Sequence, residues 1–251
     1  MATPALIDCL SADAPTVPER WMQGRTAYGG YSAALALRAA RAHAAADAHL
    51  RSVQIAFVSP LTGPLTQKAV TLREGRSTLF VRADLKTEQG VGLAGTFVFA
   101  RPQEAAATYE TATFPAEMTP VSDAKDVPRL SIMPRFIENF DLRHGGAAQR
   151  GVFQWWVRLR EGAGLDRETR LCLLGDALPP AALSLGPAAA VSSVTWQMNF
   201  HPNPANVDSE WWLLRSRTTS LGLGGSHQWM ELWAEDGTAM VSGVQQIAVF
   251  G

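Results

Sequence analysis

The stretch Arg170-Leu-Cys-Leu-Leu-Gly-Asp-Ala-Leu-Pro-Pro180 sets one carboxylate beside leucines that recur at helical spacing. Those leucines predict a helix with one buried side. They are Leu171, Leu174 and Leu178. Asp166 is the expected N-cap, and the two prolines should end the helix, because proline lacks a backbone N–H and clashes with the preceding turn. We therefore expect a buried helix with Asp176 near its C-terminal end.

Asp176 lies at a poor place for a negative charge, because a helix dipole disfavours anions at its C-terminus. One interpretation is that the side chain points to solvent or caps a neighbouring turn, since charges are rarely buried without a partner. The other is a catalytic carboxylate whose partners come from elsewhere in the chain. The helix alone leaves both interpretations open.

The composition is that of a large globular protein without a strongly charged partner. A chain of 251 residues, 47% of them hydrophobic, can bury one big core or two of ordinary size. The formal net charge of −1 gives no electrostatic reason to expect nucleic acid or an anionic membrane as partner. No apolar run approaches membrane-spanning length, and the N-terminus lacks the features of a signal peptide. We expect a cytoplasmic protein that binds neither nucleic acid nor a membrane.

The sequence shows no pattern for metal or cofactor chemistry. The two cysteines, Cys9 and Cys172, and the five scattered histidines lack metal-binding spacing. The chain has neither a glycine-rich signature for nucleotide phosphates nor the GxSxG elbow of serine hydrolases. We therefore expect no metal and no cofactor.

The run from Tyr28 to His43 is the longest helix-forming stretch of the chain and is rich in alanine. Small side chains nearly all round it would let a sheet curl closely about it. Gly29 and Gly30 stand at its start, where free backbone N–H groups collect. They form either a tight turn or a donor site for a carbonyl oxygen. Strand-like runs follow near 51–58, 64–73, 77–88 and 91–100.

The second half repeats the order of helix and then strands. Runs near 135–142 and 152–160 lead into the Asp176 helix, and further strands are expected at 193–201, 211–220, 226–234 and 238–250. This repeated order indicates an α+β protein with a duplicated domain. The expected parts are an N-terminal domain at 1–103, an aperiodic linker at 104–133 and a C-terminal domain at 134–251.

One face of the last strand is apolar except for Gln245. A buried amide there needs hydrogen-bond partners, or it costs about 1–3 kcal/mol. A structural glutamine that bonds to a nearby backbone group would satisfy the same requirement, so its role stays open at this point.

The strand 193–201 alternates strictly between two kinds of residue. One face carries apolar side chains, which are Val194, Trp196, Met198 and Phe200. The other face is polar and consists of Ser193, Thr195, Gln197, Asn199 and His201. An ordinary half-exposed antiparallel strand shows the same alternation, so the pattern alone predicts no function.

Several short motifs now add to this pattern. They are Tyr28-Gly-Gly-Tyr31, Phe57-Val-Ser-Pro-Leu61, Leu72-Arg-Glu-Gly-Arg-Ser77, Leu173-Leu-Gly-Asp-Ala-Leu178, Phe200-His201, Trp211-Trp-Leu-Leu214 and Asp236-Gly237 through Val244-Gln245. With them, nearly the whole chain resembles the acyl-CoA thioesterase II family, in its shorter thioesterase-like branch. The resemblance implies an α+β double hotdog, in which two copies of a long helix are each wrapped by an antiparallel sheet.

The resemblance also implies a catalytic set, carried over residue by residue. Asp176 matches the family's Asp through Leu-Leu-Gly-Asp, and Gln245 matches its Gln on the last strand. Ser193 falls at the position of a Thr or Ser when the strands are aligned on Phe200-His201. Thr195, two residues on and on the same face by alternation, is a rival for the hydroxyl. Pro179-Pro180 departs from the better-known members, so the helix should end soon after Asp176.

The implied reaction is hydrolysis of the thioester of a fatty or related acyl-CoA. Asp176 would accept a proton from water, while Ser193 and Gln245 hold that water and fix the carboxylate. Substrate contacts are expected from Gly29, Gly30 and Thr195, the two glycines donating to the carbonyl oxygen. Open sheet edges and outward apolar side chains on the strand 193–201 favour a homodimer or a higher homo-oligomer.

Two alternatives accompany this expectation. A protein could keep the fold as a non-catalytic acyl-CoA-binding module. A hotdog enoyl-CoA hydratase would need an Asp/His pair close together in a helix-entry loop, and the sequence contains none. The acyl chain length is not readable from the sequence.

Overall fold

The computed structural model describes residues 4–104, 107, 109, 112–186, 188, 190–202 and 207–250. Its α-helices are α1 (Leu6–Ser11), α2 (Gly29–Arg41) and α3 (Arg167–Gly175). Short 3₁₀ helices are η1 (Glu19–Trp21), η2 (Arg135–Asn139) and η3 (Ala181–Ser184). None of the helices in these ranges is long and apolar enough to cross a membrane.

One antiparallel sheet carries ten of the strands. In the first half they are β3 (His49–Phe57), β4 (Thr66–Glu74), β5 (Thr78–Thr87) and β6 (Gly90–Ala100). In the second half they are β7 (Phe140–His144), β8 (Val152–Leu159), β9 (Ala190–Phe200), β10 (Trp212–Gly222), β11 (Gly225–Ala234) and β12 (Ala239–Phe250). The strands β1 (Met22–Gln23) and β2 (Thr26–Ala27) form a separate small hairpin.

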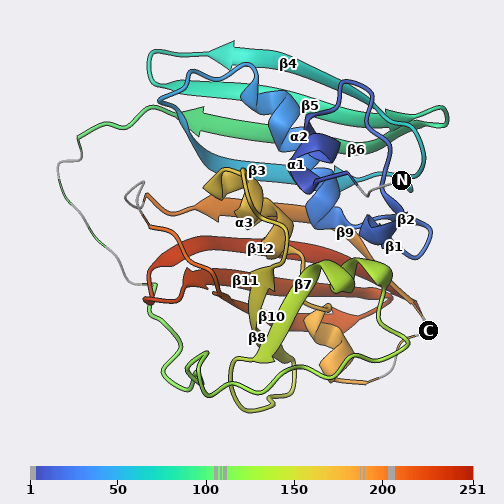
Figure 1. The fold of residues 1–251 in the computed structure, drawn as a ribbon, viewed down its shortest axis with the longest axis vertical. Coiled ribbons are helices and arrows are strands. Elements are labelled where there is room, and N and C mark those ends of the chain that lie inside the picture. Colours follow the sequence, from blue (N-terminus) through green and yellow to red (C-terminus); the bar gives the residue numbers. More distant parts are fainter. Residues whose placement is uncertain are drawn as a thin grey trace.

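The strand order is β4-β5-β6-β3-β9-β12-β11-β10-β8-β7, so the pairing of β3 with β9 joins the two halves into one sheet. Figure 1 shows α2 and α3 on the same side of this sheet, which curves around them. A helix followed by a wrapping antiparallel meander thus occurs twice, and the protein is a double hotdog. The predicted strands of both meanders lie within a few residues of the observed ones.

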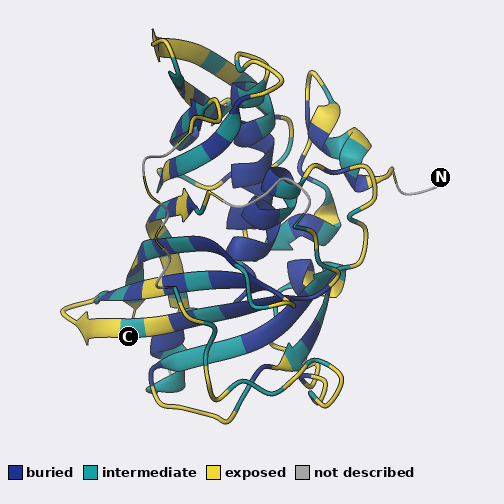
Figure 2. Cartoon of the chain, turned by 90° about the vertical axis from the view of Figure 1, so that its left-hand side faces the viewer, coloured by how far each residue is buried: buried dark blue, intermediate teal, exposed yellow. Residues whose placement is uncertain are grey.

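The two long helices lie side by side in opposite directions. The Tyr28 hydroxyl, at the start of α2, donates to the carbonyl oxygen of Leu173, at the end of α3, over 2.6 Å. At the other end Arg41 forms an ion pair with Glu168. Most of α2 is buried, as its dark blue ribbon in Figure 2 shows. The close approach requires glycine at position 30, because a Cβ there would lie 2.6 Å from the Leu173 carbonyl oxygen.

The ends of α3 follow from its caps. The Asp166 carboxylate accepts a hydrogen bond of 2.8 Å from the backbone N–H of Thr169, which confirms the predicted N-cap. The helix ends at Gly175, and Asp176 is its C-cap rather than a residue of the last turn. The carboxylate therefore extends from the end of the helix toward the start of α2.

The first predicted strand of the second half, 135–142, is only partly correct. Residues 135–139 form η2, and β7 begins at Phe140. The ring of Phe136 stacks on Tyr28 with 4.0 Å between ring centroids, and the Asn139 amide donates to two backbone carbonyls. The contacts with Tyr28 and Arg20 in the first half, and the Asn139 bond to Phe136 within the turn, favour a helical turn over an extended strand.

The strand β9 also corrects an expectation. Trp196, Met198 and Phe200 are only 2–8% exposed and belong to the buried core, so they are not outward apolar side chains. The edge of the Trp196 ring lies against the position of Gly175 in α3. Alternation shows which residues share a face of a strand, but not which face meets the helices. The homo-oligomer therefore loses this support and stays a prediction.

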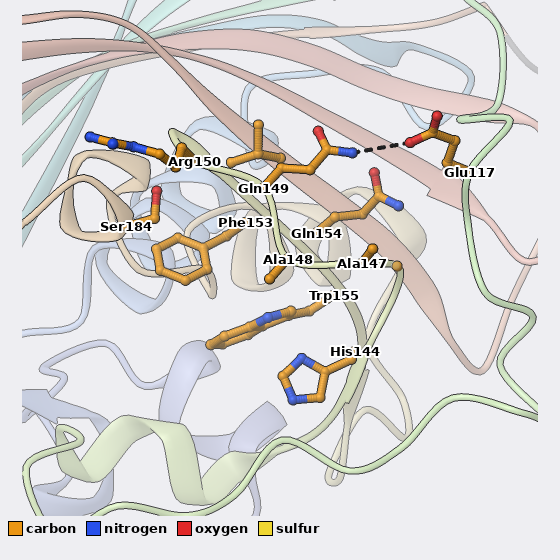
Figure 3. Close-up of a pocket in the computed structure, with 12 residues that line it drawn as sticks. Glu117, His144, Ala147, Ala148, Gln149, Arg150, Phe153, Gln154, Trp155 and Ser184 are labelled. Atoms are coloured by element: carbon orange, nitrogen blue, oxygen red, sulfur yellow. Dashed lines mark hydrogen bonds between the residues drawn. The ribbon is translucent and has the colours of Figure 1, made fainter.

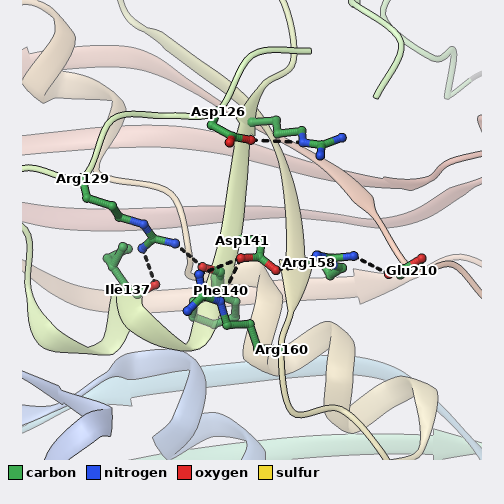
Figure 4. A network of polar contacts seen from close by, with 9 residues as sticks. Asp126, Arg129, Ile137, Phe140, Asp141, Arg158, Arg160 and Glu210 are labelled. Carbon is green, nitrogen blue, oxygen red and sulfur yellow. Dashed lines mark hydrogen bonds and ion pairs between the residues drawn. The ribbon is translucent and has the colours of Figure 1, made fainter. Parts of the chain in front are cut away.

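The described residues of 104–133 form no helix or strand, but they pack against the second half. Phe114 contacts the rings of Trp156 and Trp233, and the Trp156 indole donates to the carbonyl oxygen of Thr119 over 2.7 Å. Nearby, Asp141 accepts hydrogen bonds from Arg158 and Arg160 and so ties β7 to β8 and the turn after it (Figure 4). The predicted domain boundaries stay predictions.

The seam between β9 and β12 should be sensitive to added volume at Gly243. A Cβ there would overlap the backbone carbonyl oxygen of Gln197 in β9, which cannot move without shifting the strand. We expect Gly243→Ala to lower the free energy of unfolding by about 1–3 kcal/mol, measured by urea denaturation with an unchanged m-value. The matched control is Gly222→Ala, where a Cβ meets nothing within 4 Å. Equal midpoints for the two variants would contradict the prediction.

Candidate active site

Three polar side chains from distant parts of the chain meet beside the helix pair. The amide nitrogen Nε2 of Gln245 in β12 donates to Oδ1 of Asp176 over 2.9 Å and to Oγ of Ser193 in β9 over 2.8 Å. Gln245 is only 3% exposed. The structure thus brings together the three residues expected to form the catalytic set.

Ser193 reaches this position because β9 contains a β-bulge. Gln246 is opposite Thr195 and Ile247 is opposite Ser193, so Val194 is an extra residue in β9. The bulge puts Ser193 on the same side as Gln245, whereas Thr195 is exposed on the other side. The expectation that Ser193 and Thr195 share a face is therefore wrong, and Ser193 is the hydroxyl that contacts Gln245.

Asp176 is partly buried where the two helices meet. Burial raises the pKa of its carboxyl from 3.8 to about 7, although hydrogen bonds from the Gln245 amide and the Gly30 backbone N–H favour the charged form and lower it. The end of α3 disfavours a negative charge, but the start of α2, which faces Asp176, favours one. This arrangement leaves an acidic group that changes charge near neutral pH.

The two glycines of α2 contact this carboxylate. A Cβ on Gly29 would overlap Oδ2 of Asp176, so only glycine allows the approach. The backbone N–H of Gly30 donates to the carboxylate. That N–H was expected to meet a substrate carbonyl oxygen, but Asp176 already occupies it.

Gln228 in β11 is a further member of the cluster that the sequence analysis missed. It lies opposite Gln245 and is only 1% exposed. Its Nε2 donates to Oε1 of Gln245 over 2.7 Å, and its Oε1 accepts a hydrogen bond of 2.8 Å from the backbone N–H of Ala181. The signal was present in the sequence, because Gln228 alternates with Met230 and Leu232 just as Gln245 alternates with apolar residues.

The three expected residues line a cavity of about 150 Å³. Apolar side chains form much of its remaining wall, among them Met133, Phe136, Ile137, Trp155, Leu178 and Leu183. Trp155 also borders a second cavity of about 310 Å³, shown in Figure 3 with Phe153 and His144 near the indole. The smaller cavity therefore combines an apolar wall with one ionisable group.

Ser193 completes the chemistry that this cavity can support. Its Oγ accepts a hydrogen bond from Gln245, so its own hydrogen can be donated to another group. A carboxylate with a pKa near 7 can take up a proton at neutral pH. In the part of the chain that the structure describes, no group of three His, Cys, Asp or Glu side chains could hold a metal ion.

The raised pKa of Asp176 predicts how stability depends on pH. Between pH 4 and 7 the folded state keeps a proton on Asp176 that the unfolded state has lost. The free energy of unfolding should therefore fall as the pH rises through this window, by on the order of 4 kcal/mol from this group, and level off above it. In Asp176→Asn the free energy of unfolding should depend less on pH. Urea denaturation of both proteins between pH 4 and 8 measures this. Identical slopes for the two proteins would contradict an Asp176 that keeps its proton in the folded state up to about pH 7.

Comparison with family models assigns both halves of the chain. A model described as the acyl-CoA thioesterase N-terminal domain matches residues 17–100, and one described as the acyl-CoA thioesterase C-terminal domain matches residues 112–249. None of the curated proteins compared matches the chain.

Solved structures agree on the fold. A conserved protein of unknown function with a hotdog fold from Alicyclobacillus acidocaldarius has a TM-score of 0.86 at 21% identity, covering 100% of this chain and 99% of that one. An acyl-CoA thioesterase II from Mycobacterium marinum has a TM-score of 0.78 at 18% identity, covering 98% of each chain. At these identities the structures establish the architecture alone, whereas the two models span both halves. The chain belongs to the acyl-CoA thioesterase family.

Proposed function

We propose that the protein hydrolyses the thioester of a fatty or related acyl-CoA to the free acid and CoA. The observation that carries the proposal is the partly buried Asp176, held by Gln245 beside Ser193 in the wall of an apolar cavity. Its pKa of about 7 leaves a substantial ionised fraction at neutral pH, where a general base must be ionised.

In the proposed step, ionised Asp176 accepts a proton from water while the water oxygen attacks the thioester carbonyl carbon. The tetrahedral oxyanion then collapses, the carbon–sulfur bond breaks, and the proton passes from Asp176 to the leaving sulfur. The products are the carboxylic acid and the free thiol of CoA, and Asp176 returns to its ionised state.

The hydrogen bonds support different roles for Ser193 and Gln245. Both N–H groups of Gln245 already have acceptors, and its oxygen accepts from Gln228. Of the two roles expected for Gln245, these bonds support fixing the carboxylate, together with positioning the hydroxyl, rather than holding the water. Ser193 keeps a hydrogen that can be donated to the water or to the developing oxyanion.

The cavity supports an acyl group as its occupant, because its wall is largely apolar and Asp176 is the one ionisable group among the described residues that line it. The partner is accordingly acyl-CoA. A cytoplasmic location and a homo-oligomer stay predictions. A non-catalytic acyl-CoA-binding protein is the alternative, and its distinguishing result is binding without release of CoA.

Replacing Asp176 by asparagine should abolish most of the activity. We expect Asp176→Asn to lower kcat by about 10²–10⁴, because the base is lost while the size of the side chain is kept. Release of CoA from a series of acyl-CoA substrates measures this. In the wild type kcat/KM should rise with pH through about 7, as Asp176 loses its proton. The control is Asp13→Asn at an exposed site. Unchanged turnover in Asp176→Asn would refute the mechanism.

The two hydroxyls of β9 make a matched pair. Ser193→Ala should lower kcat by about 10²-fold, because it removes the hydroxyl beside Asp176. Thr195→Ala should stay within about two-fold of the wild type, since Thr195 is exposed on the other face and lies outside the cavity. The reverse order of effects would show that the hydroxyl comes from Thr195.

The size of the cavity predicts a preference for short acyl chains. A cavity of about 150 Å³ is of the size that holds a benzene molecule, so groups of about six carbons should fit best. Trp155 borders both this cavity and the larger one, so Trp155→Ala should join them and move the optimum of kcat/KM to longer chains. An acyl-CoA chain-length series measures both effects. An unshifted optimum in the variant would show that the acyl chain lies elsewhere.

A further inference from the structure

The cluster around Asp176 continues into a chain of hydrogen bonds whose direction is set by the backbone. The N–H of Ala181 can only donate, so the Gln228 atom that faces it must be the oxygen. The nitrogen of Gln228 then faces Gln245, which must present its own oxygen in return. As a result the nitrogen of Gln245 faces Asp176 and Ser193.

If the amide of Gln245 alone were flipped by half a turn, its hydrogen bonds to Gln228 and to Asp176 would both be lost. Its nitrogen would face the nitrogen of Gln228, and its oxygen would face the Asp176 carboxylate. The contact with Gln228 would be repulsive, and so would the contact with ionised Asp176. Neither amide can turn to water instead, since Gln228 is 1% and Gln245 3% exposed. The orientation of Gln245 is therefore imposed from the side away from Asp176.

The Ala181 N–H, which begins this chain of hydrogen bonds, owes its position to Pro179 and Pro180. Neither proline has a backbone N–H, so Ala181 carries the first one after Leu178. Pro180 is the N-cap of η3, and Ala181 begins that helix, where N–H groups have no partner within the helix. The two prolines thus connect Asp176 to Ala181, whose backbone N–H is available to Gln228.

We propose that Gln228, oriented by the Ala181 N–H, is a positioning residue that keeps the Gln245 amide turned toward Asp176 and Ser193. The proposal deepens the proposed function and rests on it for its effect on turnover. Its effect on the carboxyl group of Asp176 is independent of any substrate. Gln228 itself does not line the cavity.

Loss of Gln228 has a consequence that a merely structural residue would not have. Without its partner, Gln245 can rotate and accept the O–H of protonated Asp176 through its oxygen. The ionised carboxylate then lacks the donor that stabilises its charge. The pKa of Asp176 should consequently rise above about 7. Turnover at neutral pH should fall, and it should recover at higher pH.

The first test uses Gln228→Met, which keeps the length of the side chain but removes both hydrogen bonds. We expect kcat/KM for acyl-CoA hydrolysis at pH 7 to fall about ten-fold or more, with KM within about two-fold and the pH midpoint moved upward. The matched control is Gln246→Met on the neighbouring exposed position, which should leave the profile unchanged. An unmoved midpoint in Gln228→Met would overturn the proposal.

A second variant, Gln228→Glu, tests the donor-to-acceptor direction of the hydrogen bonds from Ala181 to Gln245. When protonated, this side chain can accept from Ala181 through its carbonyl oxygen and donate its O–H to Gln245, which reproduces the order of the wild type. When ionised it can only accept. Its kcat/KM relative to the wild type should therefore fall as the pH rises. A constant ratio would contradict the proposed direction.

A measurement without substrate separates this proposal from the proposed function. The pH window in which the free energy of unfolding depends on Asp176 is obtained by comparison with Asp176→Asn. In Gln228→Met its upper end should move above about pH 7. A shifted window with no hydrolysis by the wild type would reject the proposed function alone, whereas hydrolysis with an unshifted window would reject the positioning role alone.

Discussion

The antiparallel contact between α2 and α3 is the constraint on which the rest of the structure depends. It places the end of one helix against the start of the other, so that a carboxylate at an unfavourable terminus meets backbone N–H groups at a favourable one. The contact is possible because Gly29 and Gly30 leave room for the Asp176 carboxylate and the Leu173 carbonyl oxygen. The sheet then curves around the pair. Burial and local charge are thus set by how the helices pack.

The polar groups at the junction are satisfied as one set. Gln245 bonds through both N–H groups and its oxygen, and Gln228 links it to the backbone at Ala181. Neutral donors of this kind hold a carboxylate in place without fully stabilising its charge, which is why burial still raises the pKa of Asp176. The same geometry that would make the group a useful base at neutral pH therefore lowers the stability of the folded chain when the group is ionised.

Much of this architecture was readable from the sequence. The meanders were predictable because strand periodicity is strong in both halves, and Asp176 and Gln245 stood out because each interrupts an apolar pattern. Ser193 came from the family resemblance instead. The bulge at Val194 could not be predicted, since alternation assumes regular pairing and the extra residue shows only when β9 is set against β12. Gln228 carried the same signal as Gln245, but its meaning depends on the register that places the two amides opposite each other.

The ion pair of Arg41 and Glu168 makes one end of the α2–α3 pair chemically different from the other. Such a difference is possible because both helices belong to one chain. Both ends of the helix pair contain a carboxylate. A guanidinium neutralises Glu168, whereas the donors to Asp176 among the described residues are the neutral Gln245 amide and the Gly30 N–H. Glu168 also accepts a hydrogen bond from the backbone of Leu50 in β3, so that end anchors the helices to the sheet. Two identical hotdog subunits would have to place the same groups at both ends. Covalent fusion of the halves removes that symmetry. The Glu168 end can then hold the helices and the sheet together, while the Asp176 end keeps a carboxyl group that changes charge near neutral pH.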